Sequence, residues 1–247
     1  MSETLTVLVP CFNESGNIRS TVEEIQRVAP SLDIDVEILL LDDGSTDDTA
    51  TIMRELCDEA SNVAMRVNPR NLGVGRTILN VYNDFPDDRW LTVFPGDGEL
   101  IFDSIRAHLD VRRDYDLVLG YLQNSIIRPF HRRIASQSFT QTVNALYGYS
   151  YTYLNGMKLY RASVFKDIDV VSSGHAFNAE LLGKALLRNP SLRIGEVPFR
   201  ARGRASGNSK AIRPRSIVQA IVDVYQGYQS VADYRDQVIR EKAVKDE

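Results

Sequence analysis

Short apolar runs alternate with helix-like segments through the first half of the chain. Runs of strand length predict strands over Leu5–Val9, Val36–Leu41, Trp90–Phe94 and Leu117–Gly120. Between them, apolar residues at helical spacing predict helices over Ile18–Val28, after Thr46, and over Arg76–Tyr82. This alternation is typical of an α/β fold, so we expect a mostly parallel central sheet flanked by helices.

The second half is less regular. We predict helices over Phe130–Tyr147 and Phe177–Leu187, and strands over Met157–Tyr160 and Leu192–Phe199. Basic residues then crowd a loop rich in Gly, Ser and Asn, namely Arg200, Arg202, Arg204 and Lys210. From Ile217 to Val238, apolar residues recur every three or four positions, which predicts a long C-terminal amphipathic helix. Packing on the domain is its default role, and a homodimer seam or a membrane-surface helix is the alternative.

Length and composition limit the class of protein. The 247 residues fit one large soluble domain, which we divide at 1–120, 121–212 and 213–247. The chain has neither a signal-like start nor a run of the ~18 apolar residues that a spanning helix needs, so we expect a cytoplasmic protein. Peripheral contact with the inner face of a membrane stays open. The net charge of -4 argues against nucleic acid as a partner.

Cysteine and histidine do not predict a metal site. Cys11 and Cys57 form neither a CxxC pair nor a disulfide framework, so we expect reduced thiols. The three histidines have no ligand-like spacing.

The most informative stretch is VEILLLDDGSTDDT, where an apolar run ends in Asp42 and Asp43 before a helix begins. Ligands of open α/β sheets bind at the carboxyl ends of strands, where two adjacent acids can receive the donor groups of a nucleoside. A helix cap followed by a solvated turn is the alternative.

Three further loops follow the ends of predicted elements: Asn13-Glu14, Asn71 to Arg76, and Asp97-Gly98-Glu99. Acids that alternate with a glycine at a strand end can point into one cleft. Asp97 and Glu99 could there hold Mg²⁺ or Mn²⁺ against a diphosphate. A turn with solvated acids is the alternative.

Read together, these segments resemble glycosyltransferase family 2, and within it the dolichyl- or polyprenyl-phosphate sugar transferases. They occur in the expected order: VPCFNE, LLLDDGSTDDT, NLGVG, FPGDGE, NGMKLYR, FNAELLGKAL and EVPFRARGRASGNSK. The resemblance implies a Rossmann-like GT-A fold, a nucleoside diphosphate sugar donor, a divalent Mg²⁺ or Mn²⁺ ion, and inversion at the anomeric carbon. Residues 1–120 would then bind the nucleotide sugar and residues 121–212 the acceptor.

The resemblance also implies roles for single residues. The base and ribose would be surrounded by Pro10, Asn13, Glu14, Asp42 and Asp43, with Gly73 and Arg76 beside the nucleotide. The phosphates would be closed over by Arg204, Ser209 and Lys210. We expect Asp97, Glu180, Arg204 and Lys210 to act in catalysis.

The chain departs from the family pattern at three places. Pro95 holds the place of the first metal acid, and Thr152 that of a common Asp. The Glu-Asp pair that serves as base in many members is missing, which leaves Glu180 as the nearest candidate.

A missing base favours a phosphate acceptor. A phosphate monoester is already ionised at neutral pH and can attack without a base, whereas a sugar hydroxyl needs general-base help. Arg128, Arg132 and Arg133 could pair with that phosphate, beside an aromatic surface that includes Tyr147 and Tyr153. Ordinary core aromatics are the alternative.

We therefore predict a metal-dependent inverting hexosyltransferase that moves a sugar to a polyprenyl phosphate. The nearest alternative keeps the fold and donor but uses the hydroxyl of a soluble glycan or small metabolite. A nucleotidyltransferase or a non-catalytic binding module are more distant alternatives.

Overall fold

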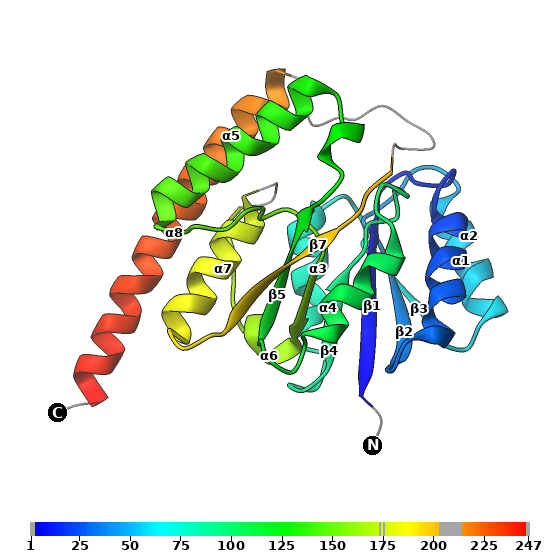
Figure 1. The fold of residues 1–247 in the computed structure, drawn as a ribbon, viewed down its shortest axis with the longest axis horizontal. Helices are drawn as coiled ribbons and strands as arrows, with labels where there is room; N and C mark the ends of the chain where they lie inside the picture. The colour runs from blue at the N-terminus through cyan, green and yellow to red at the C-terminus, as the bar shows by residue number, and fades with distance from the viewer. Residues whose placement is uncertain (1–2, 173, 175, 203–213, 246–247) are drawn as a thin grey trace.

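The computed structural model describes residues 3–172, 174, 176–202 and 214–245. A seven-stranded sheet in the order β3-β2-β1-β4-β6-β5-β7 forms its centre (Figure 1). The strands are β1 (Thr4–Cys11), β2 (Asp35–Asp42), β3 (Val63–Val67), β4 (Trp90–Val93), β5 (Leu117–Leu122), β6 (Lys158–Arg161) and β7 (Ile194–Phe199). The helices are α1 (Ile18–Val28), α2 (Thr49–Glu59), α3 (Val74–Tyr82), α4 (Ile105–Asp110), α5 (Phe130–Tyr147), α6 (Ala162–Phe165), α7 (Phe177–Arg188) and α8 (Pro214–Lys245).

The strand order reverses at β1. β1 pairs in parallel with β2 on one side and with β4 on the other. The chain therefore moves outward through β2 and β3, then returns across β1 to form β4. Only β6 runs antiparallel to its neighbours β4 and β5. A reversal of this kind leaves a crevice at the carboxyl ends of β1, β2 and β4, where α/β proteins bind their ligands.

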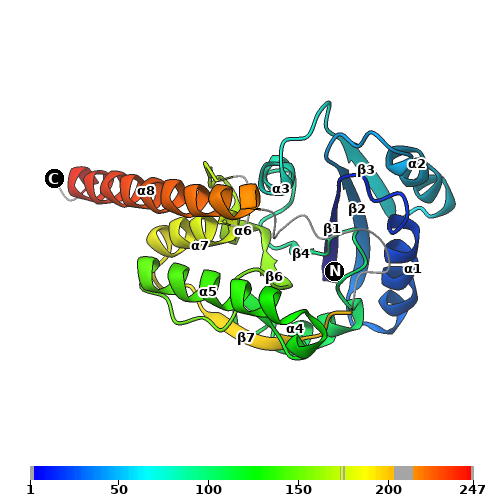
Figure 2. The same cartoon turned by 90° about the horizontal axis from the view of Figure 1, so that it is seen from above.

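Two apolar layers cover the sheet, one on each face. Val7 and Val9 of β1 face the layer that contains α1, α2 and α4. Leu8 faces the opposite layer, which contains α3, α6 and α7. Because both faces are buried, the strand is apolar at every position from Leu5 to Val9 except Thr6, as expected for a central parallel strand. Figure 2 shows α1 and α2 on one side of the strands and α3 and α7 on the other.

The C-terminal helix α8 packs on α7 and α5 and extends past the sheet (Figures 1 and 2). Tyrosine rings join α5 to α8. The ring of Tyr147, at the end of α5, lies 5.4 Å from Tyr149 and 5.6 Å from Tyr228 of α8, measured between centroids. The helix α8 thus packs on the domain, which is the default role that we expected for it.

The predicted α/β architecture is confirmed, including the mostly parallel sheet, the flanking helices and the C-terminal helix. The pattern missed β3, α4 and α6. β3 is an edge strand in which only Val63 is buried, so it has no apolar run to detect. The helices α4 and α6 have six and four residues, too few to show a helical period.

Candidate active site

Carboxylates from three loops converge at the carboxyl ends of β1, β2 and β4. At the centre lies Cys11, the last residue of β1. Burial raises the pKa of the Cys11 thiol, and the negative charges of Glu14, Asp42 and Asp97 raise it further. These three acids therefore surround one point, as the sequence predicted for the loops that carry them.

Glycine at position 96 permits the close approach of the Asp97 turn to β1. A Cβ at Gly96 would overlap the Cys11 sulfur. The Gly96 amide donates to the Pro10 carbonyl at 3.1 Å, which continues the pairing of β1 and β4 beyond the strands. Asp97 is thus held beside the end of β1.

The β1 and β2 loops are joined by side-chain hydrogen bonds. Asn13 has a φ of 56°, a left-handed conformation that asparagine tolerates. Its Oδ1 accepts from the Thr46 amide at 2.8 Å, and its own amide donates to Ser45 Oγ at 2.9 Å. The Glu14 amide donates to Thr49 Oγ1 at 2.9 Å. Asn13 and Glu14 therefore help to build the wall of the crevice on which Asp42 lies.

The two adjacent acids Asp42 and Asp43 point to different partners. Both are buried, with at most 4% exposed. Asp42 Oδ1 accepts from the Ser45 amide at 3.0 Å and so stabilises its own turn. The Asp43 carboxylate instead accepts from four donors of the following loop, the Asn68 side chain, the Leu72 and Gly73 amides and the Thr77 hydroxyl, at 2.7–3.0 Å.

Asp43 therefore shapes the segment that leads into α3. Gly73 has a φ of 87°, which glycine adopts without strain, and it begins α3. A Cβ at Gly75 would lie 2.9 Å from the Phe177 ring, so the starts of α3 and α7 touch. Arg76 is half exposed at this junction, with its Nη1 3.9 Å from Asp169.

The Glu99 carboxylate is paired with two arginines. Arg128 Nη2 lies 2.7 Å from Glu99 Oε1, and Arg132 Nη2 lies 3.3 Å from the same oxygen. Arg128 also donates to Tyr153 Oη at 3.0 Å. The structure thus brings the predicted acceptor cations to the turn that carries Asp97. This pairing was not anticipated, because sequence separation gives no sign of it.

The two acids of this turn differ in their suitability as metal ligands. Asp97 supplies a hard carboxylate oxygen of the kind Mg²⁺ and Mn²⁺ prefer, and its Oδ1 accepts from the Glu99 amide at 3.1 Å. Glu99 is neutralised by Arg128 and would have to leave it to bind a cation. Within the described ranges, no group of three or more His, Cys, Asp or Glu side chains is placed to hold a metal. Donor phosphate oxygens would have to complete such a site.

Arg133 follows Arg132 directly on α5. Its Nε is buried and has no hydrogen-bond partner among the residues the structure describes, and the same holds for Arg128 Nε. Both N–H groups are thus hydrogen-bond donors at the edge of the Asp97 turn.

The basic loop after β7 begins beside this turn. The Arg202 amide donates to the Glu99 carbonyl at 2.7 Å, and Arg202 Nη2 lies 2.7 Å from the Glu24 carboxylate. The three residues of the loop that were predicted to bind phosphate, Arg204, Ser209 and Lys210, lie outside the described residues.

Glu180 has a packed environment. It is fully buried and accepts from the Val171 and Ser172 amides, the Ser172 hydroxyl and Lys184 Nζ. Lys184 also donates to Ser230 of α8 at 2.7 Å. Burial alone would raise the pKa of Glu180, but the hydrogen bonds of Ser172, Val171 and Lys184 lower it below its usual value. The carboxylate therefore joins α7 to α8 through Lys184.

Two further contacts bear on the predicted acceptor half. The Thr152 amide donates to Glu196 Oε1 at 2.8 Å, so a carboxylate from β7 lies at the place where the family commonly has an Asp. Tyr147 stacks on Tyr149, and Tyr149 lies tilted against Tyr151, as core aromatics do, whereas the Tyr153 hydroxyl accepts from Arg128. The sequence signal for this contact is the acid Glu196 within the strand-forming segment IGEVPF.

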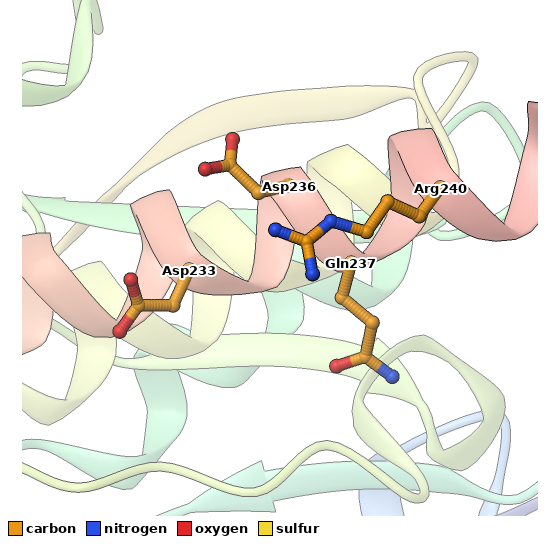
Figure 3. Close-up of a pocket in the computed structure, with 4 residues that line it drawn as sticks. All are labelled: Asp233, Asp236, Gln237 and Arg240. Atoms are coloured by element: carbon orange, nitrogen blue, oxygen red, sulfur yellow. The ribbon is translucent and has the colours of Figure 1, made fainter.

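A hollow of about 350 Å³ lies on α8, away from these loops (Figure 3). Asp233, Asp236, Gln237 and Arg240 line it, all on one face of that helix. Figure 3 shows the Arg240 side chain extending toward Asp236. Because one helix supplies every lining residue, the hollow is part of the exposed side of α8.

The fold and the crevice define a GT-A nucleotide-sugar transferase architecture. The family model described as glycosyl transferase family 2 matches residues 6–169, and the chain belongs to this family. It is similar to a dodecaprenyl-phosphate galacturonate synthase from Rhizobium johnstonii, with 28% identity over 212 residues that cover 83% of this chain and 61% of that protein. It is also similar to the dolichol-phosphate mannosyltransferase of Saccharomyces cerevisiae, with 24% identity over 92% of this chain and 88% of that protein.

A solved structure has the same fold. Glucosyl-3-phosphoglycerate synthase from Mycobacterium tuberculosis, in complex with Mn²⁺, UDP-glucose and phosphoglyceric acid, aligns with a TM-score of 0.65 at 17% identity. The alignment covers 92% of this chain and 80% of that one. The relatives are consistent with membership of this family, and the solved structure supports the GT-A fold.

The first prediction concerns Asp43. Asp43→Asn replaces one acceptor oxygen by an NH₂ group, which cannot accept from the buried donors, so we expect a loss of roughly 2–4 kcal/mol in the free energy of unfolding. Thermal unfolding should show a melting temperature lower by about 5–10 °C. Asp48→Ala, which removes an exposed acid of the next turn, is the matched control and should change little. Equal melting of the Asp43 variant and the wild type would contradict the assigned role.

The second prediction concerns the pH dependence of stability. The folded pKa of Glu180 lies below its unfolded value, so the unfolded state binds more protons as the pH falls. Its contribution to stability is complete above the unfolded pKa of about 4.3 and is lost as the pH drops through the folded pKa. Glu180→Gln should remove this part of the pH dependence of stability and lower the free energy of unfolding by roughly 3 kcal/mol at neutral pH, because the buried Lys184 loses its negatively charged partner.

Urea unfolding at a series of pH values measures this effect. The exposed Glu23 offers the control Glu23→Gln. An unchanged slope in the Glu180 variant would mean that another group carries the acid sensitivity.

Proposed function

We propose that this chain transfers a sugar from a nucleoside diphosphate sugar to a polyprenyl phosphate, with inversion at the anomeric carbon. One observation carries the proposal: Arg128 and Arg132 meet the carboxylate of Glu99, two residues from Asp97. Cations suited to an acceptor phosphate therefore lie next to the carboxylates suited to a donor.

The donor would bind in the crevice at the end of β1. Asp42, held in its turn by Ser45, would accept hydrogen bonds from the nucleoside, with Pro10, Asn13 and Glu14 forming the adjacent wall. Asp43 would act indirectly, by fixing the loop of Gly73 and Arg76 around the nucleotide. Arg204, Ser209 and Lys210 would close on the diphosphate from the basic loop, whose start is held at Glu99 by Arg202.

Asp97 would hold the divalent Mg²⁺ or Mn²⁺ ion, together with phosphate oxygens of the donor. A bound metal would neutralise the charge that develops on the leaving diphosphate. The Mycobacterium tuberculosis structures with Mn²⁺ or Mg²⁺ and UDP support metal use on this fold. Glu99 would assist only after exchanging its pairing with Arg128 and Arg132.

The acceptor phosphate would attack without a catalytic base. Arg128, Arg132 and Arg133 would hold the acceptor, whose ionised oxygen forms the new bond to the anomeric carbon. The bond from that carbon to the diphosphate breaks, and its electron pair leaves with the diphosphate oxygen. Attack on the face opposite the leaving group inverts the configuration. Glu180 would support this step as a packing residue, since its oxygens already accept four hydrogen bonds.

A soluble acceptor is the second candidate. The Mycobacterium tuberculosis protein of the same fold was solved with phosphoglyceric acid, a small phosphorylated metabolite. The arginine cluster fits a phosphate on either kind of acceptor. The relatives named for dodecaprenyl and dolichol phosphates favour the lipid.

The third prediction tests the metal ligand. Asp97→Ala should lower the transfer rate by roughly 10²-fold or more, since it removes the charge that would position the metal at the leaving diphosphate. Mn²⁺ titration in the presence of UDP, followed by calorimetry, should show the matching loss of affinity. Asp110→Ala removes an exposed acid outside the crevice and is the control. Full activity of the Asp97 variant in chelator would exclude the metal assignment.

The fourth prediction separates lipid phosphate from hydroxyl acceptors. Arg132→Gln should raise the KM for polyprenyl phosphate by about ten-fold or more, because one charge-assisted hydrogen bond is lost, and should leave hydrolysis of the donor unchanged. Arg113→Gln, at an exposed position, is the control. Transfer to a glycoside hydroxyl with an unchanged KM in Arg132→Gln, and none to polyprenyl phosphate, would favour the soluble acceptor.

A further inference from the structure

The segment that leads into α5 exposes large apolar side chains. Ile126 is 81% exposed and Phe130 is 72% exposed, and Ile127 and Ile134 are 42% and 46% exposed. Ile126 and Ile127 belong to a 3-10 turn (Ser125–Ile127), and Phe130 and Ile134 lie one helical turn apart on α5. We call these four residues the 126–134 patch. Contiguous exposed apolar side chains of this kind mark interaction sites.

Basic side chains are interleaved with the patch. Arg128, His131, Arg132 and Arg133 fall between its apolar members. From residue 117 to residue 166 the sequence contains six Lys or Arg residues and no Asp or Glu, although the whole chain has a net charge of -4. In space, Arg128 and Arg132 both pair with the carboxylate of Glu99. The surface around the patch therefore favours an anionic partner.

The patch lies on the same side of the molecule as the candidate active site. Figure 1 shows α5 beginning beyond the carboxyl ends of the strands, at the outer edge of the fold. The Arg128 and Arg132 side chains reach inward from this edge to Glu99. Apolar side chains thus point outward while cations between them point toward the site.

We propose that the 126–134 patch inserts into the surface of an anionic lipid bilayer. Ile and Phe side chains would enter the boundary between headgroups and acyl chains, and the net positive charge of the surrounding segment, residues 117–166, would attract anionic headgroups. Within the described ranges, no helix is long and apolar enough to cross a membrane, so this contact would lie on the bilayer surface. Its role in presenting a lipid phosphate to Arg128 and Arg132 rests on the proposed function.

Vesicle sedimentation tests the contact with the full chain. Wild type should sediment with vesicles of phosphatidylcholine and phosphatidylglycerol, and less with phosphatidylcholine alone or in high salt. The double variant Ile126→Ser/Phe130→Ser should lose roughly ten-fold or more of its vesicle affinity, because two apolar side chains no longer enter the bilayer. Ile239→Ser, which alters a 58% exposed residue near the far end of α8, is the matched control and should bind as wild type does.

Activity separates the two proposals. With a water-soluble short-chain prenyl phosphate, the double variant should work as wild type does; with acceptor embedded in vesicles, it should be slower by about the loss in binding. If wild type transfers sugar to the soluble acceptor but does not bind vesicles, the proposed membrane contact is wrong and the proposed function still holds. If wild type binds vesicles but transfers sugar to neither acceptor, the proposed function is wrong and the membrane contact still holds.

Two controls keep the test decisive. The single variant Ile126→Ser changes the most exposed member and should show an intermediate loss even if the double variant folds poorly, which circular dichroism will show. Sedimentation equilibrium will show whether wild type self-associates. A dimer that the double variant dissociates, with no vesicle binding, would assign the patch to a second copy of the chain and overturn the proposal.

Discussion

Both edges of β1 are hydrogen-bonded, to β2 along its whole length and to β4 along its middle. With neighbours on both sides, the strand has no free edge and is buried on both faces. Its carboxyl end lies where the strand order reverses, the point at which α/β sheets bind their ligands. The strand ends there at Cys11, and the turns that carry Asp42 and Asp97 lie around this residue. The position of the crevice follows from this pairing.

The carboxylates of the crevice divide their work according to their partners. Both carboxylate oxygens of Asp43 accept hydrogen bonds from the loop before α3, whereas Asp42 accepts one from the Ser45 amide of its own turn. Glu99 is neutralised by arginines, and Asp97 lies two residues away on the same turn. Residues that look alike in the sequence thus have separate functions, because each function depends on which donors lie within reach. A substrate that displaces a partner would change the charge of the site as well as its shape.

The sequence predicted the fold well because its central strands are buried on both faces and read as continuous apolar runs. It also predicted that the loops of Glu14, Asp42 and Asp97 meet, since the ends of parallel strands share one edge. It did not predict the four donors on Asp43, the arginines on Glu99 or the Glu196 carboxylate at Thr152. These contacts join residues 25 to 44 positions apart, and residue type alone does not specify such partners. The division at residues 120 and 212 stays a prediction.

The contact between Gly96 and Cys11 has a consequence for how the sequence can vary. The two residues occupy one shared volume, so any side chain at position 96 would displace the sulfur beneath it. A larger residue there is compatible with the crevice only if position 11 becomes smaller at the same time. Positions 11 and 96 should therefore change together or not at all, which makes them a coupled pair although neither is expected to touch a substrate.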